Sequence, residues 1–288
     1  MSIRIVTDST ADLPAEVASQ HQIEVVPLGV LFGDEELRDG IDISAETFFT
    51  RLQNESQLPT TSQPSAGAFR EVYERLAADG ATEILSIHVS GKLSGTLEAA
   101  RQGASGLDVH VIHVDSQIAS LALGIGVVAV SQAVERGATL DEARDLAEDQ
   151  FRRTHCFFVL DTLEYLRRGG RIGNARAALG TLLKVKPILA FRDGEVVDAG
   201  RARTRAKAFE EALRLAAEFR PIEQMMVVDT TTPNDVEYVA DRLRNIAPEA
   251  TMVTGMIGPT VGVHAGPGAV GFAVVSAPAP DSSPPADG

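Results

Sequence analysis

The stretch EILSIHVSGKLSGTLEAARQGASGLDVHVIHVDS, Glu83 to Ser116, determines the class of fold. It begins with an apolar run over 83–90 that is typical of a buried strand, and it continues with a helical segment over 95–104. A second strand pattern follows at 109–116. A strand, a helix and a strand in this order form a parallel pair of strands with the helix packed against them.

The same alternation continues on both sides of this unit. Toward the N-terminus, strand, helix and strand patterns occupy the segments 3–9, 13–21 and 23–32. Downstream, an apolar helix begins at Ile118, and the sequence TLDE at 139–142 has the spacing of a capping box that starts another helix. The sequence therefore predicts that residues 1–154 form an α/β domain, in which a parallel sheet lies between two layers of helices.

The pattern changes in the second half of the chain. Two strand patterns within 186–203 are joined at Asp193-Gly194, which is a strong signal for a β-hairpin. Because hairpins here are mixed with helices, residues 155–277 are predicted to form a second, α+β domain with antiparallel hairpins. Residues 278–288 are rich in Pro, Ser and Asp, and we expect them to form a disordered tail.

Composition excludes some classes of partner. The 288 residues include 26 Lys and Arg against 40 Asp and Glu, a formal net charge of −14. This balance argues against nucleic acid as the main partner, because a phosphate backbone requires a basic face. The one cysteine, Cys156, lies in the apolar run HCFFVL, so we predict a buried structural thiol rather than a nucleophile.

The sequence also carries no pattern of an integral membrane protein. Its first residues lack the apolar core of a signal peptide. The longest apolar stretch, Ile118 to Val130, is shorter than the ~20 residues that a span requires, and it predicts a buried helix. We therefore expect a cytoplasmic protein.

Three polar segments follow apolar strands and are candidates for a binding site. They are TTSQPS at 60–65, SGKLSGT at 90–96 and HAGPGAVG at 264–271. In open α/β sheets, ligands bind in the loops beyond the carboxyl ends of the strands. The first of the three contains hydroxyl and amide side chains but no charge, which is a composition suited to a carboxylate.

The second segment leads directly into a helix. Ser94, Gly95 and Thr96 would present hydroxyls and free N–H groups at the helix N-terminus, where anions are attracted. The alternative is that Ser94 merely caps its helix, since serine is a preferred capping residue.

Histidine and arginine offer further candidates. His264 precedes a glycine-rich turn and suits a neutral donor or a cationic partner for an anion. The basic cluster YLRRGGRIG, 165–173, can hold phosphate, or it is simply a solvated loop. No cluster of Cys, His and carboxylates has the spacing of a metal site, and neither a metal nor a cofactor is expected.

These segments together resemble the DegV family of bacterial lipid-binding proteins. The matching segments occur in the family's order and are VTDSTADLP, TTSQPS, SGKLSGT, LEYLRRGGRIG, LLKVKPIL and HAGPGAVG. The resemblance implies an α/β domain followed by an α+β domain, with a long-chain fatty acid in a tunnel between them.

The resemblance also implies roles for particular residues. The residues that it assigns to the fatty-acid carboxylate are Thr61, Ser62, Ser94, the N–H group of Gly95, and His264. Some members of the family are the fatty-acid-binding subunit of a bacterial fatty-acid kinase, in which a separate ATP-dependent kinase converts the bound acid to an acyl phosphate, a phospholipid precursor. Arg171 matches an arginine linked to phosphoryl transfer, and Arg203 is expected near the contact with the kinase.

Two other functions are compatible with the sequence. The protein can be a fatty-acid carrier or sensor without a kinase partner. It can also be a hydrolase that uses Ser94 with His264, although no orienting acid and no nucleophile elbow are recognisable. The expected role is therefore that of a ligand-binding protein without catalytic residues of its own.

Overall fold

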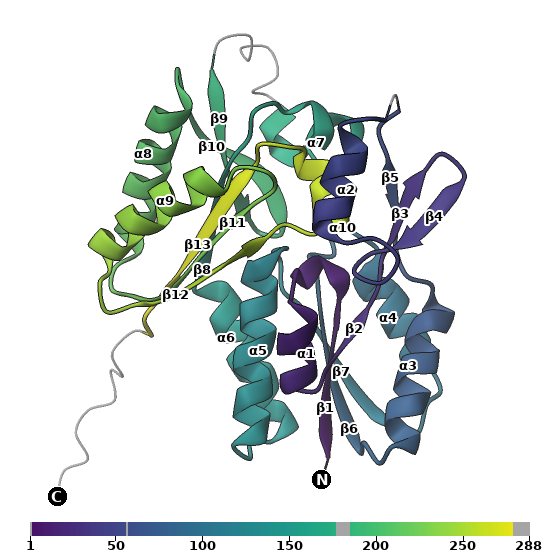
Figure 1. Ribbon diagram of the computed structural model, residues 1–288. Helices are drawn as coiled ribbons and strands as arrows, with labels where there is room; N and C mark the ends of the chain where they lie inside the picture. The colour runs from purple at the N-terminus through teal and green to yellow at the C-terminus, as the bar shows by residue number, and fades with distance from the viewer. Residues whose placement is uncertain (1, 56, 177–184, 279–288) are drawn as a thin grey trace, which may run out of the picture.

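The computed structural model describes residues 2–55, 57–176 and 185–278, and Figure 1 shows the arrangement of their elements. Within these residues the chain forms a four-stranded, a six-stranded and a three-stranded sheet. The α/β class, with a parallel sheet and a separate mixed sheet, is confirmed.

The four-stranded sheet has the order β2-β1-β6-β7, and all its neighbouring strands are parallel. Its strands are β1 (Ile3–Asp8), β2 (Ile23–Val26), β6 (Glu83–His88) and β7 (His110–Asp115). The helices on one side are α1 (Ala15–Gln20), α5 (Leu121–Glu135) and α6 (Leu140–Arg152), and those on the other are α3 (Ala66–Ala78) and α4 (Thr96–Ala104), as Figure 1 shows. We call this predicted three-layer unit the parallel-sheet lobe.

The six-stranded sheet has the order β10-β9-β8-β13-β11-β12, and only its edge pair β11 and β12 is parallel. Its strands are β8 (Thr154–Val159), β9 (Lys186–Arg192), β10 (Glu195–Ala202), β11 (Ile222–Asp229), β12 (Thr251–Met256) and β13 (Val270–Ser276). The helices α8 (Arg205–Ala216) and α9 (Pro233–Ile246) cover one face (Figure 1), and we call this unit the mixed-sheet lobe.

The two faces of the six-stranded sheet belong to different cores because side chains alternate along a strand. Met225 and Val227 of β11 pack in the cluster that contains α8 and α9. Met226 and Val228 pack instead in the cluster that contains α5 of the parallel-sheet lobe. The mixed sheet is therefore buried between its own helices and the neighbouring lobe.

The predicted hairpin is confirmed at the turn between β9 and β10. Asp193 and Gly194 both have positive φ, 50° and 79°, which is the backbone conformation that this dipeptide favours. Cys156 is buried in β8, as predicted, and burial raises the pKa of its thiol to about 12. The thiol is therefore protonated at neutral pH and chemically inert.

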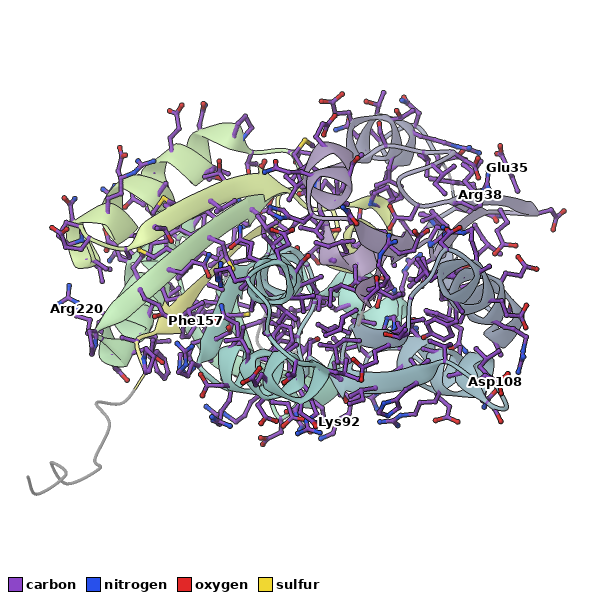
Figure 2. The ribbon with its side chains drawn as sticks, turned by 90° about the horizontal axis from the view of Figure 1, so that it is seen from below. Glu35, Arg38, Lys92, Asp108, Phe157 and Arg220 are labelled. Atoms are coloured by element: carbon purple, nitrogen blue, oxygen red, sulfur yellow. The ribbon has the colours of Figure 1, made fainter. Side chains whose placement is uncertain are left out.

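The three-stranded sheet was not predicted. The segment 23–32, expected as one strand, divides at Pro27 because proline has no N–H group to donate to a sheet. Its second part, β3 (Gly29–Phe32), pairs antiparallel with β4 (Glu35–Arg38) and β5 (Thr60–Ser62). Figure 2 shows Glu35 and Arg38 of β4 on the outside of the molecule, beyond the parallel sheet.

Four of the remaining elements lie around or next to this small sheet, and they are η1 (Ser9–Ala11), α2 (Ala45–Leu52), α7 (Glu164–Arg168) and α10 (Pro259–Ala265). The fifth, η3 (Ala217–Phe219), directly follows α8 in the mixed-sheet lobe. Ser44 caps α2, since its hydroxyl accepts a hydrogen bond from the N–H of Thr47, and serine directly before a helical segment is a typical signal for such a cap. Helix α10 was not predicted, because its sequence, PTVGVHA, contains a glycine and β-branched residues.

Some expectations concern residues outside the described part of the chain. The sequence ARAALGTLLKV at 175–185 has a pattern that predicts a helix, and most of this segment, 177–184, lies outside that part. The tail expected at 278–288 lies there from residue 279 onward. The domain boundary at 154/155 stays a prediction, although β8 begins beside it at Thr154.

Candidate functional site

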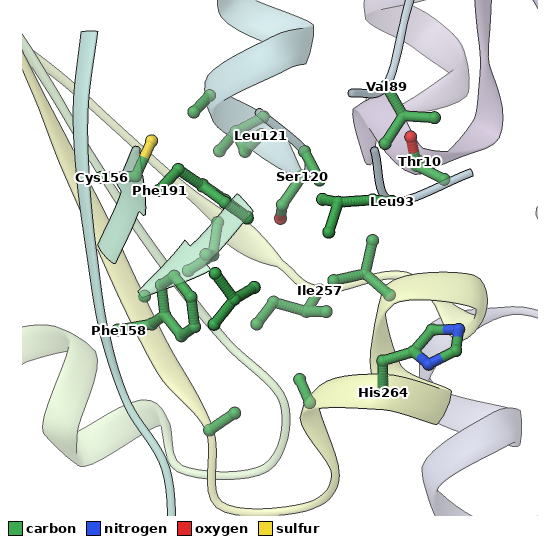
Figure 3. A pocket seen from close by; sticks show the side chains of 18 of the residues that line it. Thr10, Val89, Leu93, Ser120, Leu121, Cys156, Phe158, Phe191, Ile257 and His264 are labelled. Atoms are coloured by element: carbon green, nitrogen blue, oxygen red, sulfur yellow. The ribbon is translucent and has the colours of Figure 1, made fainter. Parts of the chain in front are cut away.

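A cavity of about 140 Å³ lies between the two lobes. Most of its lining is apolar and comes from η1, α5, the mixed sheet and α10, and the polar side chains among the lining residues are Thr10, Thr61, Ser94, Ser120, Arg171, Thr260 and His264, with the thiol of Cys156. Figure 3 shows His264 at one side of this space and Phe158, Phe191 and Cys156 at the other. An apolar interior with a few convergent polar groups is typical of a site for a small amphipathic molecule.

The polar side of the cavity is centred on Thr61 and His264. Thr61 lies on β5, opposite Val30 of β3, and His264 lies in the last turn of α10. Thr61 Oγ1 and His264 Nε2 are 3.0 Å apart and form a hydrogen bond. The tertiary structure thus brings together two of the residues that the sequence indicated, although 203 positions separate them.

The imidazole of His264 is enclosed. A Cβ atom placed on Gly169 would lie only 2.1 Å from His264 Nδ1, so glycine is required for the ring to pack there. Burial, together with the positive charge of Arg171, lowers the pKa of His264 to about 4. The imidazole is therefore neutral at physiological pH, and the cationic alternative for His264 is not favoured.

Arg171 lies beside the same ring and also lines the cavity. Its Nε donates to the carbonyl oxygen of Leu93 at 2.9 Å, and its Nη1 donates to that of Gly169 at 2.7 Å. It therefore ties the loop after α7 to the loop before α4. The predicted basic loop is in part a structural clamp, with the guanidinium held at the polar side of the cavity.

Ser94 lines the cavity just before α4. Its Oγ lies 2.8 Å from Thr96 Oγ1 and accepts the N–H of Thr96 at 3.3 Å. The alternative that Ser94 merely caps its helix is wrong in its position, because Gly95 is the N-cap residue of α4, although the Ser94 hydroxyl does accept the N–H of the first helical residue and also lines the cavity. The hydrogen bonds of the described residues pair Ser94 with Thr96 and His264 with Thr61, which is not the nucleophile–base pair of a hydrolase.

Gly95 is the N-cap residue of α4, but it is covered by a neighbouring side chain. A Cβ atom on Gly95 would lie 2.1 Å from Gln63 Oε1, so Gln63 packs directly on this glycine. Gly95 is not among the residues that line the cavity. Gly95 has no side chain, so only its backbone N–H group, in the loop that it shares with Ser94, remains a candidate donor to a ligand.

Ser62 and Arg203 lie away from this cavity. Ser62 follows Thr61 in β5, and adjacent side chains in a strand point to opposite faces. Its hydroxyl accordingly donates to Glu36 Oε1 at 2.5 Å. Arg203 is exposed between β10 and α8, and the cavity lining does not include it.

A second, more polar cavity of about 420 Å³ adjoins the first. The two share Thr61, Arg171 and His264, and the other residues that line the second are Gln57, Leu58, Pro59, Thr60, Tyr165, Arg168, Gly169 and Val263. We call this space the vestibule. Arg168 is paired with Glu164, at 2.5 Å from its Nε to Oε1, and it brings a second guanidinium to the vestibule wall.

Two buried carboxyl groups, those of Asp12 and Asp39, contact the start of α10. This is the helix whose last turn carries His264. Asp39 Oδ2 accepts the N–H of Thr260 at 3.2 Å, and Asp12 Oδ2 accepts the Ser120 hydroxyl at 2.5 Å. A Cβ atom on Gly258, the N-cap residue, would lie 2.5 Å from Asp12 Oδ1, so this carboxyl also packs on the start of the helix. Burial raises the pKa of both Asp12 and Asp39.

Sequence reasoning missed three polar residues of the lining, Thr10, Ser120 and Thr260. Thr10 could have been predicted from the pattern of polar residues after apolar strands, because it follows the first strand in the sequence TDST. Its Oγ1 donates to Asp8 Oδ1 at 2.5 Å, and Asp8 is the N-cap residue of η1. Ser120 and Thr260 lie in segments whose proximity to the site is set by the packing of α5 and α10.

In the described ranges, no group of three or more His, Cys, Asp or Glu side chains has a geometry that could hold a metal ion. Among the helices in those ranges, none has both the length and the apolar character that a membrane span requires.

Comparison with known proteins identifies a family. The chain matches the sequence model described as uncharacterised protein, DegV family, over residues 2–277. A DegV domain-containing protein of Streptomyces coelicolor is 40% identical over 278 residues, which cover 95% of this chain and 98% of that protein.

Solved structures show the same fold. A DegV family protein from Thermus thermophilus, described by its fatty-acid binding, has a TM-score of 0.89 at 36% identity, with 96% of this chain and 100% of that chain covered. DegV from Bacillus subtilis, described as a fatty acid binding protein, has a TM-score of 0.87 at 32% identity, with 96% and 100% covered. Both of these relatives are thus described as proteins that bind fatty acids.

Proposed function

The chain belongs to the DegV family, and we propose that it binds a long-chain fatty acid in the cavity between its two lobes. The observation that carries the proposal is the apolar cavity whose polar side is the hydrogen-bonded pair of Thr61 and His264. The acyl chain would lie among the apolar residues toward Phe158 and Phe191, and the carboxylate would lie at Thr61.

Burial of the acyl chain supplies most of the affinity. Each buried CH₂ group contributes about 0.8 kcal/mol, so a sixteen-carbon tail contributes roughly 10 kcal/mol before the entropic costs of binding. Residues of α5, β8, β9, β11 and β13 supply this apolar surface.

The polar side fixes the register of the ligand. A buried carboxylate is costly unless it is hydrogen-bonded, and the proposed partners are Ser94, the Gly95 N–H and Thr61, which is itself hydrogen-bonded to the neutral His264. Ser62 is not retained in this site, because its hydroxyl donates to Glu36 on the opposite face of β5. Neutral donors leave the carboxylate more nucleophilic than a direct arginine clamp would.

A nucleophilic carboxylate suits a role as the substrate-presenting subunit of a fatty-acid kinase. In that reaction a carboxylate oxygen attacks the γ-phosphorus of ATP on a separate kinase, and ADP leaves. The vestibule beside Thr61 and His264 offers space for the incoming phosphoryl group, and Arg171 and Arg168 on its wall supply positive charge. Arg203, which is exposed on the mixed-sheet lobe, is a proposed contact with the kinase.

The first test is mass spectrometry of lipid extracted from the purified protein and again after incubation with palmitate or oleate. We expect one fatty acid per chain, and a lower occupancy in Thr61→Ala and Ser94→Ala. A protein that remains free of lipid after both incubations would contradict the binding function.

The second test separates kinase subunit from carrier. With a purified bacterial fatty-acid kinase and ATP, the loaded protein is expected to yield acyl phosphate, and Arg171→Ala is expected to lower the yield more than the occupancy. Full occupancy without any acyl phosphate would favour the carrier or sensor.

A further inference from the structure

The two ring nitrogens of His264 lie in very different surroundings. Nε2 is 3.0 Å from Thr61 Oγ1 and hydrogen-bonded to it. Nδ1 is buried and has no hydrogen-bond partner among the described residues. It packs on the backbone of Gly169, where an added Cβ atom would lie 2.1 Å away.

The partners of the two nitrogens favour one tautomer. An N–H on Nε2 has Thr61 Oγ1 as its acceptor, whereas an N–H on Nδ1 would be a buried donor without an acceptor among the described residues. The tautomer with its proton on Nδ1 is therefore disfavoured.

We propose that neutral His264 carries its proton on Nε2 and donates it to Thr61 Oγ1, so that the Thr61 hydroxyl points its own hydrogen into the cavity and is the direct donor to the ligand carboxylate. The identification of that anion rests on the proposed function. A hydroxyl carries a single hydrogen, so a hydroxyl that already accepts from the imidazole is left free to donate to the ligand. His264 is then a positioning residue that acts through Thr61.

The imidazole and the Thr61 hydroxyl would then form a chain of two hydrogen bonds that ends at the carboxylate. Hydrogen bonds in such a chain strengthen one another when they are shielded from water. The neutral imidazole thus supports the carboxylate through a hydroxyl, without an ion pair.

The tautomer can be read directly by ¹⁵N NMR of the histidine side chains in the unliganded protein at neutral pH. We expect a pyrrole-like resonance for His264 Nε2 and a pyridine-like resonance for Nδ1, assigned by their loss in His264→Gln. A pyrrole-like Nδ1 would overturn the proposal, whether or not the protein binds a fatty acid.

Variants test the link to the ligand through calorimetric titration with palmitate. Glutamine can place an N–H near the position of Nε2, whereas asparagine reaches only the position of Nδ1. We expect His264→Gln to remain within about threefold of the wild type, and His264→Asn to weaken binding about 10- to 100-fold. Similar losses in both variants would contradict a donor role for Nε2.

The hydroxyl of Thr61 gives the matched pair of changes. Thr61→Ser is expected to retain binding, and Thr61→Val is expected to lower the affinity for palmitate about 10- to 100-fold. Thr50→Val, at an exposed residue of α2, serves as control.

The double variant Thr61→Val/His264→Asn is expected to bind no worse than Thr61→Val, because His264 acts through Thr61. Additive losses would show that His264 contacts the carboxylate independently and would overturn the relay. Failure of the wild type to bind palmitate would overturn the proposed function together with the role of Thr61, and the NMR spectrum would still decide the tautomer.

Discussion

At the scale of single residues, the site depends on which face of an element a side chain occupies. Thr61 and Ser62 are adjacent and chemically similar, yet β5 directs Thr61 to His264 and Ser62 to Glu36. Close packing determines the position of His264 as much as polarity does, because its ring can pack only against a residue without a side chain. A site of this kind is sensitive to the addition of a single methyl group.

We predict that Gly169→Ala weakens fatty-acid binding. The backbone of Gly169 has an ordinary φ of −71°, so alanine is tolerated by the chain, but its Cβ would displace the His264 ring. Overpacking of this kind costs about 1–3 kcal/mol, which corresponds to roughly 5- to 150-fold in affinity for palmitate.

The matched control is Gly67→Ala in the first turn of α3. The nearest atom to its added Cβ is Ser65 Oγ, at 3.6 Å, which is ordinary contact. We expect unchanged binding and equal or higher stability there. Equal affinities of the two variants would show that the position of His264 does not matter.

At the scale of elements, α5 packs in one core cluster with residues of the mixed sheet. Its glycines, Gly124 and Gly126, allow neighbouring segments of the parallel-sheet lobe to approach closely. A Cβ on Gly124 would lie 2.4 Å from the carbonyl oxygen of Ala11 in η1, and one on Gly126 would lie 2.4 Å from the ring of Phe151 in α6.

We predict that Gly124→Ala is more destabilising than Gly126→Ala. The first change meets backbone, which can yield only by moving η1 and with it Thr10, whereas the second meets the end of a side chain that can rotate. Urea denaturation is expected to show a loss of about 1–3 kcal/mol for Gly124→Ala. At Gly126, the higher helix propensity of alanine should largely offset the loss of stability that the added methyl group causes. The opposite order of stabilities would contradict this account of the packing.

At the scale of the whole molecule, buried ionisable groups couple stability to pH. The pKa of His264 is about 4 in the folded protein, while an unfolded histidine titrates near 6.5. Between these values the unfolded chain binds more protons, so the stabilising contribution is present above pH 6.5 and is lost as the pH falls toward 4. The carboxyls of Asp12 and Asp39 have raised pKa values and act in the opposite direction, since they stabilise the fold as the pH falls through their titration range.

We predict that His264→Gln flattens the pH dependence of stability between about pH 6 and 4.5. The free energy of unfolding of the wild type should change with a slope that is steeper by up to about 1.4 kcal/mol per pH unit than that of the variant. His110→Gln, at an exposed histidine of β7, is the control and should leave the slope unchanged. An equal slope in the wild type and His264→Gln would show that His264 is not buried neutral.

The sequence alone was sufficient for the class of fold, and it indicated four of the polar residues that line the cavity, Thr61, Ser94, Arg171 and His264. Alternation of strands and helices depends on local hydrophobic periodicity, and so do the hairpin at Asp193-Gly194 and the cap of α2 at Ser44. The choice of hydroxyls and a histidine as partners for an anion also followed from residue type and from position after apolar strands.

Only the tertiary structure decided which of these residues meet. It converted the expected loop at Thr60 to Ser62 into a strand, which separates Thr61 from Ser62, and it formed α10, which Asp12 and Asp39 hold beside the parallel-sheet lobe. These features depend on contacts between segments far apart in the chain, such as the 221 positions between Asp39 and Thr260. Local periodicity carries no information about such contacts, because the free energy that selects them comes from packing the two lobes against one another.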